Sequence, residues 1–298
     1  MPYVTVGEEN SQDINIHFED HGSGRPVVLI HGFLLGGQSF EKQEAALLDA
    51  GYRVVTYDRR GFGSSSRPSV GYEFDTFVSD LENILVELDL HDVTLVGFSI
   101  GAGEVIRHVG TFGSERVVGA VLLAPLPPLL VKAGDAPDGI GRLLDRWIEW
   151  ISADRPEWIK RFLDDYYNID VLGGHRVSDQ AWQQSFIVAS TSSATGTLEC
   201  VNACFEDFRR DLSRIHVPCL IVQGDQDRIF PAELSGNRVS EHVENIRTIS
   251  VAGGPHAIIW THAEHVNTAL LEFLATQLST EVRKPTPPRA EADGQGGL

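Results

Sequence analysis

Ser99 is the residue in this sequence best placed to act as a nucleophile. It lies in the pattern Gly97-Phe98-Ser99-Ile100-Gly101, which follows an apolar run typical of a strand and precedes a segment with a helical pattern. In a G-x-S-x-G sequence, the small flanking residues let a serine occupy a strained turn above a sheet, with its hydroxyl exposed. Alternatively, Ser99 only caps the helix. The strand before it and the helix after it favour the nucleophile.

A serine hydroxyl is a weak nucleophile unless a base takes its proton, and the base needs a third group that fixes its tautomer. Two later segments supply these residue types, because Asp225 and Asp227 follow one predicted strand and His256 follows the next. Either carboxylate fits the role of the acid. We favour Asp227, since Asp225 is closer to the strand end and is well placed to stabilise the turn. The predicted catalytic residues are therefore Ser99, Asp227 and His256.

The negatively charged oxygen of an acyl-transfer intermediate requires two hydrogen-bond donors held at its position. We predict that these are the backbone N–H groups of Ile100, directly after the nucleophile, and of Phe33, in the glycine-rich loop that follows a buried strand. His31 begins that loop, and we expect it to hold the loop in place rather than to transfer a proton.

The elements that must position these residues alternate between strands and helices. Apolar runs and helical spacings in alternation predict an α/β fold with a mostly parallel, doubly wound sheet. Residues 13–20 alternate apolar and polar side chains, which indicates an antiparallel strand at the sheet edge. The other predicted strands are residues 27–30, 53–57, 93–96, 117–123, 217–222 and 246–251, and the predicted helices are residues 40–50, 75–88, a segment from Gly101 onward, and 263–278.

Residues 126–212 have a different character, with aromatic-rich helical patterns in place of strand-like runs. We interpret them as a helical cap inserted into a core formed by residues 1–125 and 213–279. Residues 280–298 are rich in proline, glycine and charged residues, which predicts a disordered tail. We expect the insertion to cover the site and form an apolar pocket, which favours small or aromatic apolar substrates. The candidate pocket residues are Leu34, Trp147, Phe162, Phe186 and Ile229.

The charge balance excludes some classes of partner. The chain carries 24 basic and 42 acidic residues, a net charge of −18, which opposes binding to nucleic acid or to an anionic membrane. Its first residues lack the pattern of a secretory signal, and no apolar run is long enough to span a bilayer. Three cysteines, an odd number, are interpreted as buried thiols rather than disulfides. We therefore expect a soluble, cytoplasmic protein.

We interpret the remaining histidines as surface or core residues, and metal binding is the alternative for two of them. His262 and His265 have a spacing that would suit metal binding on a helix, but no nearby set of carboxylates and cysteines supports it. We expect neither a metal nor another cofactor. The sequence leaves open whether the chain forms a homo-oligomer.

Several motifs along the chain together resemble those of one family. They are His31-Gly32-Phe33, residues 57–65, 71–77 and 96–101, Asp207-Phe208-Arg209, residues 224–227, and Pro255-His256 with Thr261-His262-Ala263. From about Val27 to Leu278 the chain resembles the cofactor-free bacterial haloperoxidase and aryl esterase group of α/β-hydrolases. The resemblance implies hydrolysis of carboxylic esters and a promiscuous perhydrolase activity, in which hydrogen peroxide replaces water and the resulting peracid oxidises halide. It also implies that Ser99, Asp227 and His256 form the triad, and Phe33 and Ile100 the oxyanion pair.

The chain departs from this group at two positions. At the position of Leu34 the haloperoxidase members usually have proline, whereas the aryl esterases have leucine, as this chain does. Ile100 stands where the group commonly has methionine. The first departure favours an esterase that acts on a small-molecule ester with water or peroxide as acyl acceptor. Hydrolysis of lactones or lactams is an alternative within the same chemistry. A non-enzymatic ligand receptor on the same fold is the alternative from another class.

Overall fold

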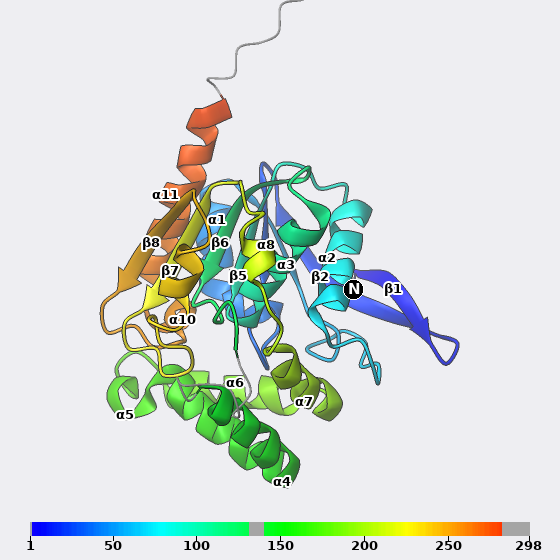
Figure 1. Cartoon of the computed structure of the whole chain (residues 1–298), viewed down its shortest axis with the longest axis vertical. Helices are drawn as coiled ribbons and strands as arrows, with labels where there is room; N and C mark the ends of the chain where they lie inside the picture. Colours follow the sequence, from blue (N-terminus) through cyan, green and yellow to red (C-terminus); the bar gives the residue numbers. More distant parts are fainter. Residues whose placement is uncertain (1, 131–139, 282–298) are drawn as a thin grey trace, which may run out of the picture.

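The computed structural model describes residues 2–130 and 140–281, which form a sheet flanked by helices on both faces (Figure 1). The eight-stranded sheet has the order β1-β2-β4-β3-β5-β6-β7-β8. β2 pairs antiparallel with β1 and with β4, whereas all other neighbouring strands of the sheet pair in parallel. The predicted α/β class with a mostly parallel sheet is therefore confirmed. The strands are β1 Tyr3–Glu9, β2 Gln12–Gly22, β3 Pro26–Ile30, β4 Arg53–Tyr57, β5 Val93–Phe98, β6 Val117–Leu123, β7 Cys219–Gly224 and β8 Ile246–Val251.

The strand order reverses direction at β3, and this reversal creates the place for a site. The chain passes from β3 to β4 on one side, and then crosses back over β3 to β5 and β6 on the other. Because such crossovers are right-handed, α1 lies on one face of the sheet, and α2 and α3 lie on the other. Ligands bind in the crevice at the carboxyl ends of the strands where the order reverses. The loops after β3 and β5 border that crevice.

The helices of the core pack in two groups. α1 (Glu41–Asp49) packs against α11 (Ala263–Glu281), and α2 (Phe74–Glu87) packs against α3 (Ile100–Phe112). Both α2 and α3 bury an apolar face, and the whole of β5 is buried between the layers. Shorter helices complete the core, namely η1 Gly37–Phe40, α9 Gly236–Ser240 and α10 Ile258–Thr261.

Between β6 and β7, five helices and no named strand are found among the described residues. These are α4 Ile140–Tyr167, α5 Ile169–Leu172, α6 Asp179–Ser190, α7 Ala194–Ala203 and α8 Arg209–Leu212. We call α4 to α7 the cap helices, because they gather at one end of the sheet (Figure 1). α4 is interrupted at Asp154, whose carboxylate accepts the N–H of Glu157 and starts a second helical segment. α8, within the predicted insertion, packs against α3 of the core.

Two predictions need correction. The strand at residues 13–20 is not at the sheet edge, because β1 pairs along its outer side, with Tyr3 opposite His17. β1 was not predicted, since it buries mainly Val4 and leaves most of its other side chains exposed, so its apolar signal is weak. The final helix continues to Glu281, which places the first two residues of the predicted tail 280–298 in a helix. The rest of that tail lies outside the described residues.

Candidate active site

Ser99 sits in a sharp turn between β5 and α3. Its backbone has φ 55° and ψ −119°, a conformation that residues with a side chain rarely adopt. The Ser99 N–H donates to the Leu123 carbonyl at the end of β6, at 2.9 Å. A Cβ at Gly97 would lie 2.2 Å from the Gly101 carbonyl oxygen, and one at Gly101 would lie 2.3 Å from the Ile30 carbonyl oxygen. Close backbone packing therefore requires both glycines of the pattern.

The three residues predicted to be catalytic form one chain of hydrogen bonds. His256 Nε2 lies 2.8 Å from Ser99 Oγ, and His256 Nδ1 lies 2.7 Å from Asp227 Oδ2. All three residues are buried, with exposures of 3% for Ser99, 5% for Asp227 and 1% for His256. The arrangement can move the hydroxyl proton of the serine to the imidazole while the carboxylate orients the ring.

The Asp227 carboxylate is held by its own loop. Oδ1 accepts the N–H groups of Ile229 and Phe230, both at 2.9 Å, and Oδ2 also accepts the side-chain amide of Gln223 at 2.8 Å. These donors compensate a buried negative charge and fix the orientation of the carboxylate. Sequence reasoning missed Gln223, since a glutamine at a strand end carries no distinctive pattern.

Asp225 occupies a different position from Asp227. Its carboxylate accepts the N–H of Gly253 at 2.7 Å, and the N–H of Gln226 donates to the Gly254 carbonyl at 2.9 Å. Asp225 thus ties the loop after β7 to the loop that precedes His256.

The two predicted oxyanion donors belong to neighbouring segments. The Ile100 N–H opens α3, where the first amides of a helix have no acceptor within the helix. The loop that carries Phe33 packs closely on the turn, because a Cβ at Gly32 would lie 2.7 Å from the Phe98 ring and 3.3 Å from Ser99 Cβ. This contact brings the Phe33 backbone to the side of the crevice where Ser99 lies.

A buried network of hydrogen bonds, which we call the core network, holds the loop that carries Phe33. The Arg59 N–H donates to His31 Nε2 at 2.9 Å, and the Arg59 guanidinium donates to the His31 carbonyl at 2.8 Å. Arg59 is also paired with Glu104 of α3, and the Tyr57 hydroxyl donates to Glu104 at 2.5 Å. The core network comprises His31, Tyr57, Arg59 and Glu104, and it joins the loop after β3 to the helix that follows Ser99.

Burial decides the protonation of two members of this network. Burial, together with the Arg59 charge, lowers the pKa of His31 well below its usual value of 6.5. The ring is therefore neutral, with Nε2 as the acceptor and Nδ1 donating to the Gly32 carbonyl at 2.7 Å. Burial, together with the Glu104 charge, raises the pKa of Tyr57 well above 10. Both groups keep one protonation state through the neutral range, which fixes their hydrogen-bond directions.

The aromatic residues predicted to line the pocket belong to two ring clusters. The rings of Trp147 and Phe162 pack together with that of Trp158, and Phe33 contacts both Trp158 and Phe162 at 5.8 Å between centroids. Phe186 instead stacks on Trp182. Leu34 and Ile229 are buried.

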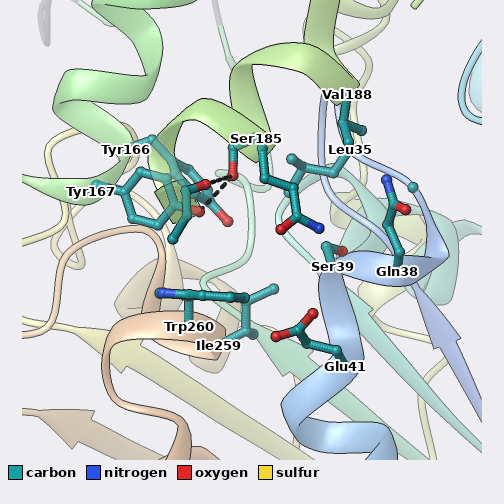
Figure 2. A pocket seen from close by; sticks show the side chains of 13 residues that line it. Leu35, Gln38, Ser39, Glu41, Tyr166, Tyr167, Ser185, Val188, Ile259 and Trp260 are labelled. Carbon is teal, nitrogen blue, oxygen red and sulfur yellow. Dashed lines mark hydrogen bonds between the residues drawn. The ribbon is translucent and has the colours of Figure 1, made fainter. Parts of the chain in front are cut away.

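A cavity between the cap helices and the core is lined by Tyr166, whose ring stacks on Phe162 of this aromatic cluster (Figure 2). Tyr166 and Tyr167 of α4, Ser185 of α6 and Trp260 of α10 border it, and the Tyr167 hydroxyl is hydrogen-bonded to Ser185 at 2.8 Å. Its described lining includes none of the five predicted pocket residues. The ring of Tyr166 also lies 5.8 Å from that of His256, so the cavity adjoins the site. Sequence reasoning missed this role for Tyr166, whose spacing indicates only a buried helix face.

Residues 2–130 and 140–281 contain neither a membrane-spanning helix nor a metal-binding cluster. No helix in these ranges is long and apolar enough to cross a membrane. No group of three histidine, cysteine, aspartate or glutamate side chains there is arranged to hold a metal ion. His262 Nδ1 lies 2.9 Å from the Thr261 hydroxyl.

The chain is similar to known proteins over most of its length. A family model for the alpha/beta hydrolase fold matches residues 25–263. A candidate non-heme chloroperoxidase of Synechocystis sp. is 54% identical over 275 residues, which cover 92% of this chain and 100% of that protein. A bifunctional esterase/perhydrolase of Acinetobacter calcoaceticus is 30% identical over 92% of this chain and 99% of that protein.

A solved structure agrees with these relatives. The crystal structure of a bromoperoxidase from Bacillus anthracis is 41% identical to this chain, with a TM-score of 0.87, and the match covers 92% of this chain and 99% of that chain. The resemblance seen in the sequence motifs is thereby confirmed. The chain belongs to the alpha/beta hydrolase fold family, in its group of non-heme haloperoxidases and esterases.

Proposed function

We propose that this protein is a serine hydrolase that cleaves small or aromatic carboxylic esters through an acyl-enzyme. The observation that carries the proposal is the hydrogen-bonded chain from Ser99 through His256 to Asp227, buried at the carboxyl ends of the strands. A hydroxyl, an imidazole and a carboxylate in this order form the arrangement that activates serine for acyl transfer. Two of its relatives are named as a bifunctional esterase/perhydrolase and a bromoperoxidase, which supports the same class of reaction.

In the first half of the proposed reaction, His256 takes the proton of Ser99 as Oγ attacks the carbonyl carbon of the ester. The N–H groups of Phe33 and Ile100 stabilise the negative oxygen of the tetrahedral intermediate. His256 then gives the proton to the leaving alcohol, and the acyl group remains on Ser99. Asp227 orients the imidazole and stabilises its charged form throughout.

In the second half, water or hydrogen peroxide attacks the acyl-enzyme. Water releases the carboxylic acid, whereas peroxide releases a peracid that can transfer an oxygen atom to halide. In both cases His256 takes a proton from the acceptor and returns it to Ser99. Leu34 has a left-handed backbone with φ 63°, which proline cannot adopt, so this loop differs from one that carries proline. This difference supports water as the main acceptor.

The experiment that tests the proposal combines covalent labelling with turnover. We expect a fluorophosphonate to modify Ser99 and the wild-type protein to hydrolyse p-nitrophenyl acetate. Ser99→Ala should lose both properties, with a loss of turnover of at least about a thousandfold. Activity that survives in Ser99→Ala would contradict the mechanism, and the absence of both labelling and turnover in the wild type would favour a non-enzymatic receptor. A panel of esters, lactones and lactams, with and without peroxide, then defines the acyl donor and acceptor.

A further inference from the structure

The C-terminal end of α4 is hydrogen-bonded to the two loops that carry the proposed acid and base. The N–H of Ala257, one residue after the histidine, donates to the Tyr166 carbonyl at 3.0 Å. The side-chain amide of Asn168 donates to the carbonyl of Gln226, one residue before the acid, at 2.9 Å. We call these two hydrogen bonds the cap clasp. One short stretch of the cap helices therefore contacts the backbone beside both catalytic side chains.

Asn168 forms the turn that ends α4, and its side chain makes one of the two hydrogen bonds of the cap clasp. Its backbone is left-handed, with φ 51° and ψ 54°, a conformation that asparagine tolerates better than most residues. Its carbonyl accepts the N–H groups of Val171 and Leu172, both at 2.9 Å, so α5 starts at once. Asn168 is only 3% exposed, and its side-chain Oδ1 has no hydrogen-bond partner among the described residues. Its amide group is therefore confined to a buried position against the acid loop.

The cap clasp places the Tyr166 ring against the imidazole of His256. The centroids lie 5.8 Å apart with an angle of 71° between the planes, an edge-on contact. The rings of Phe98 and Phe230 lie 5.3 Å and 5.7 Å from the same imidazole. Two of these three rings come from the core, whereas Tyr166 comes from α4. The position of the proposed base therefore depends on where the end of α4 is held.

Besides the cap clasp, the acid loop contacts the cap helices through an ion pair between Arg228 and Asp170 of α5, whose side chains are exposed. Apart from His256, the donors to the Asp227 carboxylate come from β7 and its own loop, and Asp225 joins that loop to the backbone of Val251 and Gly253. We propose that Asn168 is a positioning residue. Through the cap clasp it holds the acid loop, the histidine loop and Tyr166 in one arrangement, which maintains the hydrogen bond between His256 and Ser99. This inference rests on the proposed serine hydrolase function.

Two variants of Asn168 test the role of its amide. Asn168→Asp keeps the shape and the tolerance for a left-handed backbone but turns an oxygen toward the Gln226 carbonyl. Asn168→Gly keeps the backbone and deletes the amide. Asn202→Asp is the matched control, because it makes the same chemical change at an exposed position of α7. Labelling with a fluorophosphonate gives two numbers for each protein, namely the fraction of chains labelled at completion and the rate constant of labelling.

We expect both Asn168 variants to be labelled to the same final fraction as the wild type, with a rate constant about tenfold lower. The kcat for p-nitrophenyl acetate should fall by a similar factor with a much smaller change in KM, and Asn202→Asp should match the wild type. A lower labelled fraction with an unchanged rate constant would mean that Asn168 only stabilises the fold, and would overturn the proposal. Wild-type rate constants in both variants would also overturn it. Failure of the proposed function is distinct, because the wild type itself would then not be labelled at Ser99.

Discussion

Two regions hold the candidate site, and they differ in chemistry. The core network, built around the buried pair of Arg59 and Glu104, joins the loop after β3 to α3. The cap clasp, made by Tyr166 and Asn168, lies over the acid and the base and uses only neutral groups. Removing one partner of a buried ion pair leaves an uncompensated charge, whereas removing a neutral hydrogen bond costs much less. We therefore expect the side of the proposed nucleophile to be held by the buried ion pair, and the side of the proposed acid and base to depend on the cap helices.

The largest expected effect comes from breaking the core network. Glu104→Gln leaves the charge of Arg59 buried, with its Nη1 already without a partner among the described residues. We expect the free energy of unfolding to fall by about 3 to 5 kcal/mol, measured by urea denaturation. Glu115→Gln, at an exposed position, is the control and should change it by less than about 0.5 kcal/mol. If Glu104→Gln costs less than about 1 kcal/mol, the contrast between the two regions is wrong.

The free energy of unfolding should also depend on pH, through His31 of the core network. The pKa of His31 is well below 6.5 in the folded protein, so below that pH the unfolded chain binds a proton at this residue that the folded protein does not bind. The free energy of unfolding should therefore decrease as the pH falls below 6.5. The maximal slope from one such group is about 1.4 kcal/mol per pH unit.

His31→Gln removes this titrating group. Although the variant is expected to be less stable at neutral pH, its stability between pH 5 and 6.5 should depend less on pH than that of the wild type. Chemical denaturation at several pH values measures both slopes. Equal slopes in the two proteins would show that His31 is not held neutral by its burial.

The smallest effect is expected next to the cap clasp. Arg228, directly after the proposed acid, pairs with Asp170 of α5 at 2.7 Å, but the two side chains are 41% and 64% exposed. Exposed ion pairs contribute little, because water and salt screen them. Arg228→Ala should therefore change the free energy of unfolding by less than about 0.5 kcal/mol and the rate of labelling by less than about twofold. A loss as large as that of Asn168→Gly would mean that the exposed ion pair, and not the buried amide, holds the cap.

The parts of the fold that were predictable depend on local patterns. The α/β class and the turn around Ser99 followed from apolar runs that end in glycine, and close backbone contacts explain why those glycines are needed. Asp227 and His256 could be proposed because both follow strands whose carboxyl ends meet at one edge. The interpretation of residues 126–212 as a separate cap stays a prediction, as do the pocket residues.

The parts that were missed depend on contacts between distant segments. Arg59 and Glu104 are 45 residues apart, and Asn168 and Gln226 are 58 apart, so no local periodicity indicates either contact. β1 is recognised only through its register with β2, since its own side chains are mostly exposed.

The left-handed turn at Ser99 has a consequence for how this chain can diverge. A residue with a side chain at φ 55° carries a conformational cost on the order of 1 kcal/mol or more, which glycine would avoid. The backbone at this turn therefore gives no reason to keep a side chain, whereas the proposed reaction requires one. A lineage that no longer needs the reaction would be free to replace its serine while keeping this architecture.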